Sequence, residues 1–189
     1  MSAPKTSPGP ATKRQGHPGA PVALAGAALL EQCASVIRSS DTRCYCGESA
    51  TIRGGTLGKH VRHVLDHFRA ALDAADDPRL VIDYDHRERD VPMESDPGAA
   101  LASIANLRER LLGVTDASVD RPVVVRFMIT GDGTEAELRS TLGRELAFAA
   151  HHAVHHHAMM GAIATEFGLR VGPEFGKAPS TINHDRHGR

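Results

Sequence analysis

One segment of the 189-residue chain, GRELAFAAHHAVHHHAMMGAIATEFG (residues 143–168), constrains the fold more than any other. Its apolar residues recur every three to four positions, which predicts a long amphipathic helix from about Ser140 to Phe167, closed by Gly168. Such a helix must bury its apolar stripe, so further helices are expected to pack against it. The segment also holds five histidines within residues 151–157, and their role depends on which of them face inward.

Three more segments repeat this apolar periodicity, at residues 21–38, 56–75 and 98–112. Pro21 suits the first turn of a helix, where its missing N–H has no partner to lose. Residues 121–138 differ, because a β-branched run there precedes a Gly-Asp-Gly turn, which is typical of a strand. These patterns predict an all-α fold, an antiparallel four-helix bundle with a short β-strand/loop insertion between helices.

The chain has the length of one domain with flanking tails. Residues 1–20 are rich in Pro, Gly, Ser and Lys and have no apolar face, which predicts a disordered N-terminal tail. The bundle is expected to span residues 21–170. Residues 171–189 have the turn chemistry of a C-terminal loop or tail.

Charge and cysteine content exclude several classes of protein. A formal net charge of −1 gives no electrostatic field that would attract nucleic acid. No apolar run approaches the roughly 18–20 residues of a membrane span, and three cysteines do not suggest a secreted disulfide scaffold. We therefore expect a cytoplasmic protein that binds neither nucleic acid nor membrane. The spacing of Cys44 and Cys46 does not match a zinc knuckle, although a redox or metal-binding role for them stays open.

Two of the predicted helices place histidines on an inner face. In the segment 56–75, His60, His63 and His67 are spaced i, i+3 and i+7, so they lie on one stripe. In the last helix, His152 and His156 form an i, i+4 pair on the apolar stripe. His155 lies on the border between that stripe and the exposed face, whereas His151 and His157 are expected at the edges of the stripe.

Histidines on facing helices can build a metal site in the interior of a bundle. Neutral imidazole is a ligand for Zn, Ni, Cu or Fe, and we predict a divalent metal ion (Zn, Ni or Fe) bound by histidines from both helices. Two alternatives stay open. The rings could be ordinary hydrogen-bonded core residues, or a solvated tract that adsorbs metal loosely.

The two segments GKHVRHVLDH and HHAVHHHAMMGAI resemble the DinB-like family of metal-binding four-helix bundles, over residues about 22–168. The resemblance implies that His63 is the ligand of the second helix and that His152 and His156 are the H-x3-H pair of the last. This sequence departs from the family's pattern by its additional histidines: His60, His67, His151, His155 and His157. Of these, His67 is the best candidate for a fourth ligand or for part of a second metal site.

The resemblance implies a metalloenzyme in which the metal ion activates a water or a thiol, as a thiol transferase, isomerase or hydrolase. Its expected partner is a small-molecule substrate such as a low-molecular-weight thiol, with a homodimer left open. The alternative is a non-catalytic metal-binding or stress-response protein that buffers metal through its surplus histidines.

Two other features could carry chemistry. Glu145 lies on the face of His152 and is a candidate catalytic base or ligand, although an exposed pair with Arg139 or Arg144 is the alternative. The charged run from Asp83 to Asp90 could be a solvated edge strand or loop, or could reach the mouth of the site and hold an acidic substrate.

Overall fold

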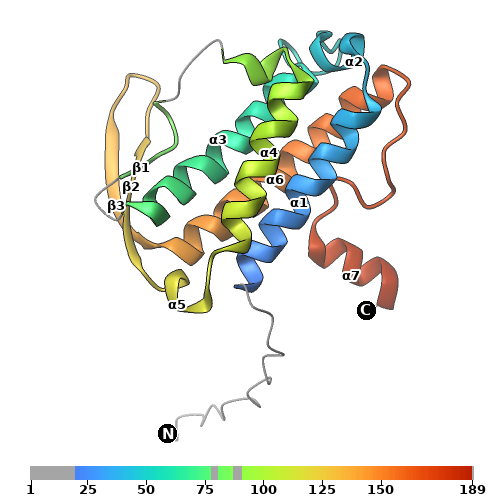
Figure 1. The fold of residues 1–189 in the computed structure, drawn as a ribbon. Helices are drawn as coiled ribbons and strands as arrows, with labels where there is room; N and C mark the ends of the chain where they lie inside the picture. The colour runs from blue at the N-terminus through green and yellow to red at the C-terminus, as the bar shows by residue number, and fades with distance from the viewer. Residues whose placement is uncertain (1–19, 78–80, 87–90, 189) are drawn as a thin grey trace, which may run out of the picture.

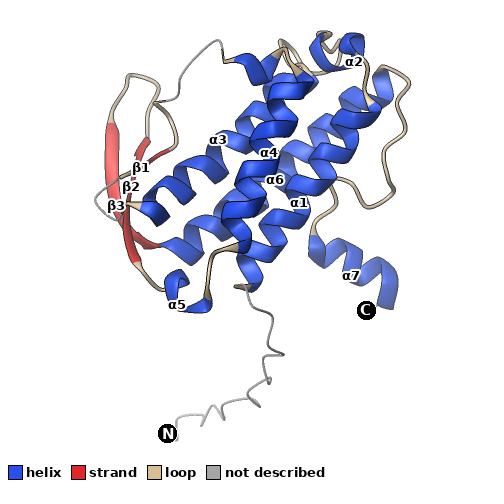
Figure 2. Cartoon of the chain, in the orientation of Figure 1, coloured by secondary structure: helices blue, strands red, loops and turns tan. Residues whose placement is uncertain are grey.

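The computed structural model describes residues 20–77, 81–86 and 91–188, which are mostly helical with a small three-stranded sheet (Figures 1 and 2). The helices are α1 (Pro21–Ser39), α2 (Thr42–Cys46), α3 (Leu57–Asp76), α4 (Pro97–Leu112), α5 (Asp116–Val119), α6 (Leu142–Glu166) and α7 (Pro179–His187). The strands are β1 (Ile82–Asp83), β2 (Pro122–Met128) and β3 (Glu135–Thr141).

The four long helices α1, α3, α4 and α6 lie alongside one another and enclose the core (Figure 1). Helix α3 packs on α6 and α4, and α1 packs on the same two helices. Their bounds confirm the four predicted helical segments to within a few residues. The core is built from aliphatic side chains with few aromatics, among which Phe68 and Tyr45 are fully buried.

Capping residues fix where the two histidine-bearing helices begin. The hydroxyl of Thr56 accepts a hydrogen bond from the backbone N–H of Lys59 at the start of α3, and Thr141 does the same for Arg144 at the start of α6. Helix α6 is followed by Gly168, whose φ of +81° is the left-handed conformation that glycine adopts without strain. These signals fix the start of α3 and both ends of α6.

The expected all-α class is incomplete, because the insertion forms a sheet in the order β1-β2-β3. Strand β1 pairs in parallel with β2 through Ile82 and Val125, and β2 pairs antiparallel with β3. The sequence allowed for one or two short strands but located only the first; it did not locate β3 and assigned the last two residues of β3, Ser140 and Thr141, to the helix. Strand β3 is largely exposed, so it lacks the apolar alternation from which a strand is predicted.

The ends of the chain also differ from expectation. The predicted disordered tail falls on residues 1–19, which lie outside the described residues. Ala20 is fully buried, and its N–H donates to the carbonyl of Val114 at 3.0 Å. The C-terminal segment predicted as a loop contains α7 (Figure 2), and the loop predicted after α1 contains the short helix α2.

Helix α1 is long and apolar enough to cross a membrane, by length and composition alone. This corrects the expectation that no apolar run reaches that length. Its buried residues include Leu30, Cys33 and Ile37, which pack in the core beside α4 and α6. A core helix passes the same test as a membrane span, so α1 by itself does not show that the protein crosses a membrane.

Candidate metal centre

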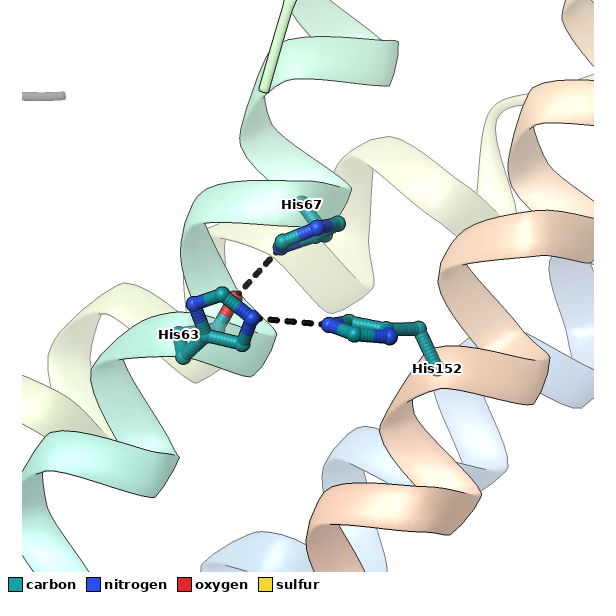
Figure 3. A group of neighbouring side chains, drawn as sticks. All are labelled: His63, His67 and His152. Atoms are coloured by element: carbon teal, nitrogen blue, oxygen red, sulfur yellow. Dashed lines mark hydrogen bonds between the residues drawn. The ribbon is translucent and has the colours of Figure 1, made fainter. Parts of the chain in front are cut away.

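The histidine stripes of α3 and α6 face each other across the contact between these two helices (Figure 3). The Nε2 atoms of His63 and His152 are 2.7 Å apart, and the Nδ1 atom of His67 lies 2.9 Å from the carbonyl oxygen of His63. His63, His67 and His152 each offer one ring nitrogen, and these three atoms lie within 4.8 Å of one another. The structure thus brings together three of the four predicted metal ligands.

The fourth predicted ligand extends this group along α6. The Nε2 atom of His156 lies 3.1 Å from Nε2 of His152, and its Nδ1 atom lies 2.9 Å from Nδ1 of His60. The rings of His67, His63, His152 and His156 pack together, with centroids 4.3–4.9 Å apart, and the ring of His60 extends this histidine row beyond His156 at 5.1 Å. The contact of His60 with His156 was not predicted, because the phase of one helix does not reveal which residue faces it from another.

Hydrogen bonds between the rings cannot satisfy all of these close nitrogen contacts. A ring nitrogen of neutral imidazole has either one N–H or one lone pair. The Nε2 atom of His152 has two close neighbours, the Nε2 atoms of His63 and His156, and it can form a proper hydrogen bond with only one of them. A cation placed among the three nitrogens would use all their lone pairs at once, so the donor set fits a metal ion.

The tautomer of His67 agrees with this interpretation. A carbonyl oxygen can only accept, so the hydrogen bond to the His63 carbonyl requires the proton of His67 on Nδ1. The lone pair of His67 is then on Nε2. In metal-binding histidines, the ring nitrogen that does not bind the metal commonly donates a hydrogen bond of this kind, which fixes the orientation of the ring.

Burial and neighbouring rings keep His156 and His60 uncharged at neutral pH. Burial, followed by the charges of His152 and His60, lowers the pKa of His156 from 6.5 to about 3. Burial, followed by the charge of His155, also lowers the pKa of His60. Because a metal ion needs the neutral imidazole, the lowered pKa values leave His156 and His60 able to bind one at pH 7.

A pocket of about 580 Å³ opens beside the row, between the sheet and the helices α3 and α6. Its apolar wall consists of Val125, Phe127, Met128, Leu138 and Phe148, and its polar lining consists of His63, His67, Tyr84, Asp85, Arg139, Ser140, Arg144, Glu145 and His152. Three of the clustered histidines thus face space that a small molecule could occupy.

Glu145 forms part of the pocket wall and is fully buried. Its carboxylate accepts hydrogen bonds from Tyr84 at 2.9 Å, from Ser140 at 2.5 Å and from Arg144 at 2.8 Å. The ring of Tyr84 in turn stacks on His67, with the centroids 4.9 Å apart and the planes at 13°. The predicted partner Arg144 is therefore present, but Glu145 is not exposed; its catalytic role stays a prediction.

The remaining histidines of α6 occupy different environments. His151 and His155 are exposed, whereas His157 is fully buried and stacks on Phe175 with the centroids 4.7 Å apart. The expectation that His157 lies at the edge is wrong, because it follows the buried Ala153 by four residues and precedes the buried Met160 by three. The same helical period that placed His152 on the inner face could have predicted that His157 is buried.

Two further predicted features lie outside the row of histidines. Cys44 is buried and Cys46 is exposed in α2, and neither lines the pocket. Of the charged run, Asp83 pairs with His86, and Asp85 lines the pocket while accepting a hydrogen bond from the backbone N–H of Met128. Residues 87–90 lie outside the described residues.

Comparison with known proteins gave one relative. FK506-binding protein 5 of Rhizopus delemar is 38% identical to this chain over 105 residues, which are 55% of this chain and 27% of that protein. The chain thus spans about a quarter of the relative it matches. No family model matches the chain, and no solved structure matches it.

This relative corrects the resemblance drawn from the sequence. The similarity is to a protein named FK506-binding protein 5, and the assignment to the DinB-like family is wrong. The metal-dependent thiol transferase, isomerase or hydrolase implied by that family is withdrawn with it, and metal buffering gains no support in its place. The metal ligands remain a prediction, because they were derived from helical spacing as well as from the resemblance.

Proposed function

We propose that this chain binds a divalent transition-metal ion, of the class of Zn, Ni or Fe, through ring nitrogens of His63, His67 and His152, with His156 adjoining them. One observation carries the proposal: a ring nitrogen from each of His63, His67 and His152 lies within 4.8 Å of the other two. In addition, the Nε2 atoms of His63 and His156 lie 2.7 and 3.1 Å from the same nitrogen of His152. Two nitrogens bound to one tetrahedral zinc ion are roughly 3.3 Å apart, given metal–nitrogen bonds of about 2.0–2.1 Å. Small rotations of these rings would therefore suffice to bind an ion.

The helices support such a site by their rigidity. His63 and His67 are four residues apart on α3, and His152 and His156 are four apart on α6, so each pair lies on one face. In our proposal α1, α3, α4 and α6 form an antiparallel four-helix bundle, a fold that builds metal sites from facing helices. The fixed backbone would hold the ring nitrogens together before an ion binds.

We further propose that the pocket beside the metal ion binds a small molecule. Its wall is apolar, and two exposed guanidinium groups, those of Arg139 and Arg144, lie at its lining. An apolar molecule with a carboxylate or another anionic group would match both features, because arginine binds carboxylates through paired hydrogen bonds.

The metal proposal is tested by titrating tag-free, metal-free protein with Co²⁺. We expect at least one tightly bound equivalent, the visible absorption of a tetrahedral cobalt site, and a rise in thermal stability with metal concentration. The matched control is His151→Ala, which removes an exposed histidine of the same helix and should leave this binding unchanged. Weak binding without a saturable first equivalent would contradict the proposal.

A second candidate function is the binding of FK506, which the name of the relative states for that protein. The apolar wall of the pocket, with Phe127 and Phe148, is the feature of this chain that favours it. By calorimetry, FK506 should bind the wild-type protein, and Phe148→Ala should weaken binding at least about 10-fold, since buried aromatic groups dominate such contacts. The exposed Leu112→Ala variant serves as control. No binding to wild-type protein would exclude this candidate.

A further inference from the structure

We propose that the outer edge of strand β3 pairs with the same edge of a second copy of this chain, in an antiparallel register centred on Leu138. The inference goes beyond the proposed function, because it concerns the free edge of the sheet and needs no metal ion. The two copies would be related by a two-fold axis, so each residue of β3 meets its partner twice.

The edge of β3 is open to a further strand. Strand β3 is the last in the order β1-β2-β3, and no strand within the described residues lies beyond it. The sheet stands at one side of the helices (Figure 1), and most residues of β3 are exposed. An exposed edge of this kind presents unpaired backbone groups that readily pair with a strand of another chain.

The pairing of β2 with β3 determines which backbone groups point outward. The N–H of Ile129 donates to the carbonyl of Thr134 at 2.8 Å, in the register of the β2–β3 ladder, so these residues form a hydrogen-bonded pair. Hydrogen-bonded pairs alternate along an antiparallel ladder, so Leu138, four residues after Thr134, also directs its backbone groups toward β2. The residues whose N–H and C=O groups point to the free edge are therefore Glu135, Glu137 and Arg139.

Charge complementarity selects the register. Two β3 edges form hydrogen bonds when outward-pointing residues face each other, and a register centred on Leu138 places Glu137 opposite Arg139 of the second copy, twice. The two neighbouring registers instead place Glu137 opposite Glu137, or Arg139 opposite Arg139, and like charges directly opposite are destabilising. Within one copy Glu137 already contacts Arg126 of β2 at 2.7 Å, so the second copy would extend a row of alternating charges. Arg139 has several N–H groups and can make this contact while it borders the pocket.

The same register covers an exposed apolar side chain. Leu138 is 56% exposed, and it would face Leu138 of the second copy at a position between hydrogen-bonded pairs, where opposite side chains are closest. Its cross-strand partner within one copy is the buried Val125, so the pairing would continue an apolar row across both copies. Most of the exposed large apolar side chains among the described residues lie on this hairpin: Val124, Met128, Ile129 and Leu138.

Sedimentation equilibrium of the metal-free protein tests the pairing. Two seven-residue strands bury less than the roughly 1,200 Å² of a standard interface, so we expect a weak dimer with a dissociation constant of about 10–100 μM. Arg139→Glu and Glu137→Arg should each weaken self-association at least about 10-fold, because each places like charges opposite one another. A mixture of these two variants should associate again, since every pair between them is then of opposite charge.

The matched control is Arg170→Glu, which makes the same change of charge at an exposed residue beyond the far end of α6 and should leave the dimer unchanged. Wild-type protein that stays monomeric up to about 500 μM would overturn the pairing. Variants that are weakened alone and do not associate when mixed would overturn the contact of Glu137 with Arg139.

Cysteine cross-linking tests the register, in a Cys46→Ser background that removes the exposed native thiol. Leu138→Cys should form a disulfide-linked dimer under mild oxidation, because opposite Cα atoms at such a position are about 4.5 Å apart, within the range of a disulfide. Ala136→Cys lies on the same face but roughly 14 Å from its counterpart, so it should stay monomeric. Equal cross-linking of the two variants, or cross-linking of Ala136→Cys alone, would overturn the register centred on Leu138.

Discussion

Replacing His152 with alanine should weaken Co²⁺ binding at the proposed site by at least about 100-fold. This is the largest effect we expect from any single histidine, since the ring nitrogen of His152 is the one that both His63 and His156 approach. Without it the remaining nitrogens no longer converge on one position. Loss of a direct ligand should exceed the 10–100-fold effect that is usual for residues that only orient a ligand.

The control for this experiment is the neighbouring histidine of the same helix. His151→Ala removes an exposed ring and should change the affinity by less than about 2-fold, a difference within the effect of an ordinary surface substitution. Circular dichroism would verify that both variants are folded. Equal losses in the two variants would indicate adsorption along the histidine tract and contradict a built site.

The metal-free protein should lose stability steeply as the pH falls from about 6.5 to about 4. His157 is fully buried, and burial lowers its pKa from 6.5 to about 4. In the unfolded chain the ring takes up a proton near pH 6.5, whereas in the folded protein it stays neutral until about pH 4. Acid therefore favours the unfolded state within this window. His157 alone should account for roughly 3 kcal/mol, at about 1.4 kcal/mol per pH unit.

The variant His157→Leu tests this attribution. It should flatten the dependence of the free energy of unfolding on pH between 6.5 and 4, as measured by urea denaturation of the metal-free protein. At neutral pH it should be neutral or stabilising, because neither ring nitrogen of His157 has a hydrogen-bond partner among the described residues and leucine buries no polar atom. Its apolar neighbour Phe175 would still be packed.

The matched control is the exposed His151→Leu, whose pH dependence should equal that of the wild-type protein. His156 and His60 also have lowered pKa values, so some acid sensitivity should remain in the His157→Leu variant. An unchanged slope in His157→Leu would show that this ring does not stay neutral in the folded protein.

The parts of the fold that the sequence predicts are those with a strong apolar period. The four long helices were predicted because each has a buried stripe, and Gly168 marks the end of α6. Strand β3 was missed because it is exposed on most of its length, so its side chains follow no apolar alternation. Helix α7 has no buried residue and was missed for the same reason.

The candidate site, too, could be predicted only in part. Helical spacing alone placed His63, His67, His152 and His156 on inner faces, where the structure has them. The contact of His60 with His156 and the hydrogen bond of Tyr84 to Glu145 join distant parts of the chain. They depend on how α3, α6 and the segment after α3 pack together, and no single-helix period contains that information.

The mistaken family assignment has a physical reason. Two histidines four residues apart share a face in any α-helix, so an H-x3-H pair follows from helix geometry and identifies no ancestry. The same pair therefore supports a metal-site hypothesis without supporting a particular reaction. The identity to FK506-binding protein 5 over 105 residues rests on far more positions than the two short motifs do.

The central claim is that the facing histidines of α3 and α6 bind a metal ion. Anomalous X-ray diffraction from crystals of the Zn²⁺-loaded protein, measured at the zinc absorption edge, tests it most directly. We predict a strong peak between the two helices, with nitrogen atoms of His63 and His152 about 2.0–2.1 Å from the ion. Peaks only at exposed histidines such as His151, with none between α3 and α6, would contradict the claim.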